Sequence, residues 1–317
     1  RVVLPAGVRP AAIEFDSTIR GVTEWDAIAG ATDYGDLVIM PGLVDSHVHV
    51  NEPGRTEWEG FASATRAAAA GGVTTIVDMP LNSIPATTSL AALETKIHAI
   101  EGQIRVDVAL WGGVVPGNTS ELRPMLDAGA RGFKCFLVPS GVDEFPHVSP
   151  AQLREAAGEL AASGAPLLVH AELLPDHDIA GSPEKYDTWL RSRPEKSEND
   201  AIALLRDVAG ETGAWIHVVH LSSASALPII REAQSAGLRF TAETTPHYLT
   251  LTDAACAGYD PNFKMHGPLR AEAAETDLVE RGADPPLELV AWRSGGKSQR
   301  HVACRAQMLE QALGLEQ

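Results

Sequence analysis

Short runs of apolar residues alternate with longer amphipathic stretches along most of the chain, from about Val44 to Glu243. The run at 73–77, for example, is rich in β-branched residues and follows two glycines, a pattern typical of a buried strand. Seven such runs are expected to be strands, at 43–48, 73–77, 105–111, 132–137, 166–170, 215–221 and 239–244. The stretches between them are expected to be helices, at 57–70, 89–101, 120–128, 150–163, 198–213 and 222–236.

Strands that alternate with helices predict an α/β fold, because parallel neighbours need a crossover connection between them. A doubly wound sheet is disfavoured because no GxGxxG pattern follows a predicted strand. The expected fold is therefore a TIM-like (β/α)8 barrel that is incomplete at the eighth strand. We expect three regions: 1–40 as part of a flanking β-sandwich-like domain, 41–270 as the barrel, and 271–317 as an atypical C-terminal segment with a helix at about 302–313.

The composition limits the partners and the location of the protein. Among the 317 residues, 42 are acidic and 25 are basic, and the net charge of −17 argues against nucleic acid as the main partner. No apolar run approaches the roughly 18 residues of a membrane-spanning helix. Three cysteines without CxxC spacing indicate neither a disulfide scaffold nor a thiolate metal site, so a cytoplasmic location is expected. The sequence opens on Arg1, and we expect a lost stretch upstream of it.

Four histidines stand at or near the ends of three predicted strands. His47 and His49 form a His-x-His pair, and residues two apart in a strand face the same side. His170 and His220 end two further apolar runs. Because barrel enzymes build their sites at the C-terminal ends of the strands, these four imidazoles are expected to meet on one rim as metal ligands. His217, three residues before His220, is expected to face the opposite side and to be structural.

Lys134 lies inside an apolar predicted strand, where an ammonium group is costly to bury. One interpretation is a buried ion pair, or a lysine whose amine reaches solvent. The other is an amine that has reacted with carbon dioxide to give a carbamate, an anion whose two oxygens can bridge two cations. Four imidazoles with such a bridge suit divalent ions such as zinc. Two of these ions can activate water and polarise a carbonyl, which suits hydrolysis of an unactivated amide.

Two long stretches of the sequence resemble a known enzyme family. The segment from Pro41 to His49, followed by Asn-Glu-Pro-Gly at 51–54, resembles the opening of the cyclic amidohydrolases, and 68–79 continues the match. Within that superfamily, 47–60 and 79–88 resemble the allantoinases specifically. The resemblance is dense from about Pro41 to Arg270. It implies hydrolysis of the hydantoin-ring amide of allantoin to allantoate, a step in purine breakdown.

Single residues separate the near relatives. Dihydroorotases resemble this segment but carry an arginine, which meets the substrate carboxylate, where this chain has Asn51. Allantoin has no carboxylate, so Asn51 fits an uncharged ureido-hydantoin. Dihydropyrimidinases and hydantoinases share the metal-binding set but usually lack the run at 51–58, and they are the alternative that differs only in substrate.

The resemblance also implies roles for individual residues. The metal ligands that it implies are His47, His49, Lys134, His170 and His220. They would hold two divalent ions, zinc first and cobalt or manganese as alternatives, with the amine of Lys134 carboxylated to bridge them. The substrate contacts that it implies are Asn82, Ser83, Ser140 and His247, for which turn or surface-loop roles are the alternative. The partners that it implies are allantoin and further copies of the chain in a tetramer or dimer.

The sequence departs from the family after the seventh predicted strand. Residues 263–270 replace a motif close to Lys-Cys-x-Pro-Pro-Ile-Arg, with Met265 and Gly267 as departures. The family's Ser-Asp-His-Ser-Pro motif, whose aspartate is both a metal ligand and the proton-transfer base, is absent. The aspartates that remain downstream are Asp253, Asp260, Asp277 and Asp284, and none ends an apolar strand. The catalytic base is therefore unassigned, and a truncated, non-catalytic barrel is a second hypothesis beside the active enzyme.

Overall fold

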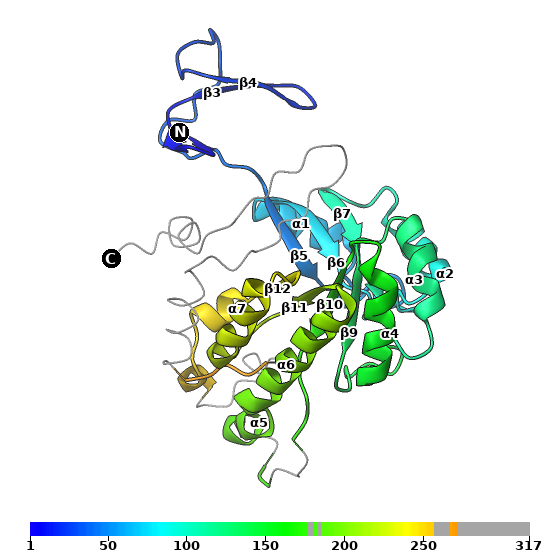
Figure 1. The fold of residues 1–317 in the computed structure, drawn as a ribbon. Helices are drawn as coiled ribbons and strands as arrows, with labels where there is room; N and C mark the ends of the chain where they lie inside the picture. The colour runs from blue at the N-terminus through cyan, green and yellow to red at the C-terminus, as the bar shows by residue number, and fades with distance from the viewer. Residues whose placement is uncertain (176–179, 183–184, 257–266, 272–317) are drawn as a thin grey trace.

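The computed structural model describes residues 1–175, 180–182, 185–256 and 267–271 (Figure 1). The predictions for Met265, Asp260, Asp277, Asp284 and the helix at 302–313 lie outside these residues. Among the helices that the structure describes, none is long and apolar enough to cross a membrane.

The N-terminal residues form two small antiparallel hairpins that stand apart from the main body of the protein (Figure 1). β1 (Val2–Leu4) pairs with β2 (Gly7–Arg9), and β3 (Ala12–Phe15) pairs with β4 (Ile19–Thr23). Several large apolar side chains here are exposed, namely Phe15, Ile19, Trp25 and Leu37. The first 40 residues thus contain four short strands, and residues 37–42 are mostly irregular.

Parallel strands form the main body. Their bounds are β5 Leu43–Val48, β6 Val73–Asp78, β7 Asp107–Leu110, β8 Gly112–Gly113, β9 Phe133–Phe136, β10 Pro166–His170, β11 Trp215–Val218 and β12 Phe240–Ala242. Strands pair in the orders β5-β6-β7 and β8-β9-β10-β11-β12, and only Trp111 separates β7 from β8. Parallel pairing in chain order is the arrangement of a (β/α) barrel. Pairing of β12 with β5, which would close the barrel, is not seen among the described residues.

Helices connect these strands and cover their outer side (Figure 1). Their bounds are α1 Phe61–Ala70, α2 Leu90–Ile100, α3 Thr119–Asp127, α4 Pro150–Ala161, α5 Tyr186–Ser192, α6 Glu195–Thr212 and α7 Leu227–Ser235, with short 3-10 turns η1 Ala224–Ala226, η2 Pro246–Leu249 and η3 Asp253–Cys256. α4 begins where Ser149 forms a capping box with Gln152. α6 ends where Gly213 takes the left-handed conformation, with a φ of 73°.

The buried side chains divide into two clusters, one for each face of the strands. In β10, Leu167 and Val169 belong to the larger cluster with the helices, while Leu168 belongs to the smaller cluster. Lys134 is paired in register with Leu168, and alternate residues of a strand share a face. Lys134 therefore lies on the face of the smaller cluster, which also contains Phe136.

Candidate functional site

The four predicted histidine ligands lie together at one end of the parallel strands. His47 belongs to β5 and His49 follows it, His170 is the last residue of β10, and His220 comes two residues after β11. The ring centroids of His47 and His49 are 5.4 Å apart, and those of His47 and His220 are 5.6 Å apart. His170 and His220 are closer, at 4.7 Å. The prediction that these side chains meet on one rim agrees with this arrangement.

Two backbone features direct these side chains. The N–H of Val50, next to His49, donates a 2.7 Å hydrogen bond to Oδ1 of buried Asp78 at the end of β6. His220 has a φ of 41°, the only positive value among the described residues other than glycine. This conformation is uncommon for a residue with a side chain and is found mainly where surrounding contacts impose it. The positive φ of His220 interrupts the alternation of side chains that β11 would otherwise continue.

The prediction for His217 was wrong in one respect, because the pleat does not continue to His220. His217 does not face away from the site. Its Nε2 atom lies 3.4 Å from Oε2 of Glu243, whose Oε1 contacts Nδ1 of His47. His217 also bonds through Nδ1 to Oγ1 of Thr241 at 2.8 Å. His217 therefore contacts Glu243, and Glu243 in turn contacts His47.

Two glutamates contact predicted ligands and were missed by the sequence analysis. Glu243 directly follows β12 and contacts His47, while Glu172 follows His170 by two residues and accepts a 2.9 Å hydrogen bond from its Nε2 atom. Both carboxylates are buried. The available signal was their position just beyond strand ends, where His47 and His170 also lie.

Lys134 is buried within β9, with 1% of its surface exposed. Its Nζ atom has no hydrogen-bond partner among the described residues and lies 4.9 Å from the ring centre of Phe136. Burial lowers the pKa of this amine from 10.5 to about 7. The structure therefore disfavours the interpretations of Lys134 as an ion-paired or solvent-reaching lysine.

Burial also keeps two of the imidazoles uncharged. It lowers the pKa of His49 to about 3, with a further contribution from the neighbouring His47, Lys134 and Lys96. Burial and the neighbouring His170 and Lys134 hold the pKa of His220 well below its usual range. A neutral imidazole has a lone pair and is the form that binds metal ions.

The predicted substrate contacts have local partners. The hydroxyl of Ser83 donates to the Pro85 carbonyl, and that of Ser140 donates to the carbonyls of Val142 and Phe145. The carbonyl of Asn82 accepts from Arg55 at 3.0 Å, and His247 is exposed in η2. The contacts of Ser83, Ser140 and Asn82 are those of loop-stabilising residues.

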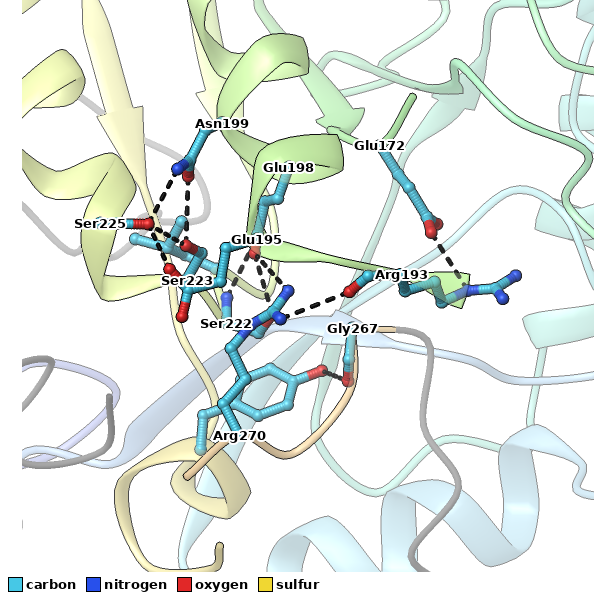
Figure 2. A network of polar contacts seen from close by, with 12 residues as sticks. Glu172, Arg193, Glu195, Glu198, Asn199, Ser222, Ser223, Ser225, Gly267 and Arg270 are labelled. Carbon is cyan, nitrogen blue, oxygen red and sulfur yellow. Dashed lines mark hydrogen bonds and ion pairs between the residues drawn. The ribbon is translucent and has the colours of Figure 1, made fainter. Parts of the chain in front are cut away.

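A pocket beside His170 and His220 is lined by two ion pairs. Nε of Arg193 is 3.1 Å from Oε1 of Glu172, and a nitrogen of Arg270 is 3.6 Å from Oε2 of Glu198. Figure 2 shows each guanidinium directed at its carboxylate. The wall of the pocket is therefore polar but balanced in charge.

The donor chemistry of the cluster fits a divalent metal centre, although the ligand geometry is not formed. Within the described ranges, no group of three or more His, Cys, Asp or Glu side chains is arranged to hold a metal ion. Two observations support the fit. Nδ1 of His170 and Nε2 of His220 face each other at 3.0 Å, and the buried amine of Lys134 has no hydrogen-bond partner in the same part of the chain.

Comparisons with known proteins agree with the resemblance that the motifs predict. The sequence model of the Amidohydrolase family matches residues 38–258. The chain is 50% identical over 300 residues to an allantoinase of Streptomyces avermitilis, covering 92% of this chain and 67% of that protein. It is 51% identical over 262 residues to a mitochondrial allantoinase of Aquarana catesbeiana, covering 80% of this chain and 54% of that protein.

Solved structures give the same result for the fold. An L-hydantoinase (dihydropyrimidinase) from Arthrobacter aurescens superposes with a TM-score of 0.80 at 31% sequence identity, covering 90% of this chain and 65% of that one. The chain thus spans about half to two thirds of the length of these proteins. With the family pattern matched over most of its length, the chain belongs to the amidohydrolase family.

Proposed function

We propose that this chain is an allantoinase, which hydrolyses the hydantoin-ring amide of allantoin to allantoate. The observation that carries the proposal is the meeting of His47, His49, His170 and His220 at one end of the strands, with the buried amine of Lys134 on the inner face. The 50% identity to an allantoinase supports the choice of substrate. A tetramer or dimer in the cytoplasm completes the proposal.

The five predicted ligands would hold two divalent ions, with zinc as the first choice and cobalt or manganese as alternatives. The buried amine of Lys134, with no hydrogen-bond partner among the described residues, supports its carboxylation, because the product is an anion with two oxygen donors. Bound ions of this kind supply an activated water and polarise the amide carbonyl.

Residues of the chain itself would hold the predicted ligands in position for this chemistry. The ring of Phe136 stacks on His170, with centroids 4.8 Å apart and planes 18° apart, and limits rotation of the imidazole. Asp78 fixes the backbone next to His49. Glu243 is occupied by His47 and His217, so we assign it no role as the proton-transfer base.

We also propose the division into regions 1–40, 41–270 and 271–317. The two antiparallel hairpins at the N-terminus and the parallel strands from Leu43 onward support the first boundary. Of the four downstream aspartates, Asp253 is described; it lies half-buried in η3, where its backbone N–H donates to the carbonyl of Arg270. This position supports no role for Asp253 as a strand-end ligand.

A hydantoinase or dihydropyrimidinase is the second candidate, because the solved structure with 31% identity has that activity in its name. Asn51 favours allantoin over acidic substrates. Its side chain is buried, and its Oδ1 atom has no hydrogen-bond partner among the described residues.

The test compares substrates and metal content in one preparation. The protein is incubated with bicarbonate and zinc, cobalt or manganese, and hydrolysis of allantoin, hydantoin and dihydrouracil is measured beside metal analysis. We expect two ions per chain and turnover of allantoin, both lost in His170→Ala and retained in His98→Ala, a histidine exposed on α2. Preference for hydantoin would support the second candidate, metal without turnover would support the non-catalytic barrel, and the absence of bound metal would refute the centre.

A further inference from the structure

We propose that Glu243 and Glu172 are positioning residues that hold His47 and His170 in opposite tautomers, so that Nε2 of one ring and Nδ1 of the other carry the lone pair. The proposal rests on the proposed metal centre, because it concerns which nitrogen each ligand offers. It concerns two carboxylates to which neither the motifs nor the comparisons give a role.

Glu243 determines the protonated nitrogen of His47. Oε1 of Glu243 contacts Nδ1 of His47, and only 11% of the glutamate side chain is exposed. An ionised carboxylate only accepts hydrogen bonds, so the proton of a neutral His47 resides on Nδ1 and its lone pair on Nε2.

Glu243 is itself fixed by a chain of hydrogen bonds. The indole N–H of Trp215 donates to Oγ1 of Thr241 at 3.0 Å, and the same oxygen lies 2.8 Å from Nδ1 of His217. The Nε2 atom of His217 is 3.4 Å from Oε2 of Glu243. Both oxygens of Glu243 are thereby engaged, one by His217 and one by His47, so the carboxylate has little freedom to rotate away.

Glu172 contacts Nε2 of His170, whereas Glu243 contacts Nδ1 of His47. Oε2 of Glu172 accepts from Nε2 of His170 at 2.9 Å, while its Oε1 atom pairs with Nε of Arg193 at 3.1 Å (Figure 2). The guanidinium of Arg193 stacks over the ring of Trp189, with 3.7 Å to the ring centre. The carboxylate is thus anchored on the side away from the histidine, and the proton of a neutral His170 resides on Nε2.

The two assignments point the remaining lone pairs in a consistent direction. With Nε2 of His170 bonded to Glu172, its Nδ1 atom is the nitrogen that faces Nε2 of His220, at 3.0 Å. A ligating imidazole almost always donates its other N–H to a carboxylate or carbonyl, which fixes the tautomer and the ring orientation. Two histidines from strands far apart in the sequence have such a carboxylate behind them here.

The first experiment reads the tautomers directly in metal-free protein. The chain is labelled with ¹⁵N-histidine, and long-range ¹H–¹⁵N spectra are recorded, with the ring signals assigned by His47→Ala and His170→Ala. We expect His47 as the Nδ1–H form and His170 as the Nε2–H form. The same tautomer at both positions, or mixtures at either, would overturn the proposal, whether or not the protein binds metal or hydrolyses allantoin.

The second experiment separates positioning from a structural role. Glu243→Ala and Glu172→Ala are each expected to weaken zinc binding by about 10–100-fold, as for other partners of ligating histidines. Glu198→Ala is the matched control, because Glu198 is equally buried but bonds to Ser222 and pairs with Arg270. It should lose stability and keep its zinc affinity.

Glu243→Gln should retain more zinc affinity than Glu243→Ala, because its amide oxygen still accepts from His47. Equal zinc affinities for the Glu243, Glu172 and Glu198 variants would contradict the proposal. Failure of the unmodified protein to bind zinc would refute the metal centre instead, and the spectra would still decide the tautomers.

Discussion

The side chains of Lys96 and Asp78 form an ion pair in the interior, with Nζ 2.5 Å from Oδ2 and at most 1% of either side chain exposed. The other oxygen of Asp78 accepts the backbone N–H of Val50. One carboxylate therefore connects α2, β6 and the residue that follows His49. The pair links the stability of the fold to the position of a predicted ligand.

Lys96→Met should lower the free energy of unfolding by about 3–5 kcal/mol, because it leaves the Asp78 charge buried without its partner. Urea unfolding at neutral pH measures the change. Arg154→Met is the control, because Arg154 forms an ion pair with Glu211 at the surface, where solvent screens the charges and such pairs contribute little to stability. Equal losses in the two variants would contradict the buried arrangement.

Replacement of Lys134 by Met should change the stability in the opposite direction. Lys134→Met removes a buried amine without a hydrogen-bond partner, so we expect the metal-free protein to gain about 1–3 kcal/mol of stability. The pKa of this amine falls from 10.5 to about 7 on folding, so the penalty is complete below pH 7 and shrinks as the pH rises towards 10.5. The gain from the substitution should shrink over the same interval, and a loss of stability at pH 6 would show that the amine has a partner.

Much of the barrel was predictable because apolar runs mark buried parallel strands. β5 and β10 have the predicted bounds, and β9 lies within its predicted run. Helix α5 was missed because it spans seven residues between longer elements, and α6 begins three residues earlier than predicted. Such boundaries depend on tertiary contacts more than on local pattern.

From the sequence, functional residues could be identified only where they stand at the end of a predicted strand. His47, His170 and His220 stand out because imidazoles at several strand ends point to one rim. Glu243 was missed because its partner His47 is 196 residues away in the sequence, and no local pattern links the two. The predicted orientation of His217 was wrong because the positive φ of His220 interrupts the strand geometry on which the prediction depended.

Two glycines should respond differently to the same substitution. A Cβ atom at Gly112 would lie 2.4 Å from the ring of Phe133, whereas at Gly132 it would lie 2.5 Å from the backbone carbonyl of Pro166. Gly112→Ala should cost about 1–3 kcal/mol, and the smaller side chain of Phe133→Leu should recover part of it. Gly132→Ala should cost more and resist such rescue, because its φ of 154° and its backbone neighbour cannot adjust. Thermal unfolding of the three single variants and the 112/133 double variant tests this.

Phe136 and Phe133 lie on opposite faces of β9 and offer a matched test of the site. Phe136 stacks on His170, while Phe133 packs in the larger cluster with the helices. Replacement of either ring by Leu should cost about 1–2 kcal/mol, less than truncation to Ala, because most of the buried volume remains. Only Phe136→Leu should also weaken zinc binding, because it removes the surface that holds the His170 ring in place. Zinc affinity measured by competition with a chelator would decide, and equal affinities in the two variants would show that the stacked ring contributes packing alone.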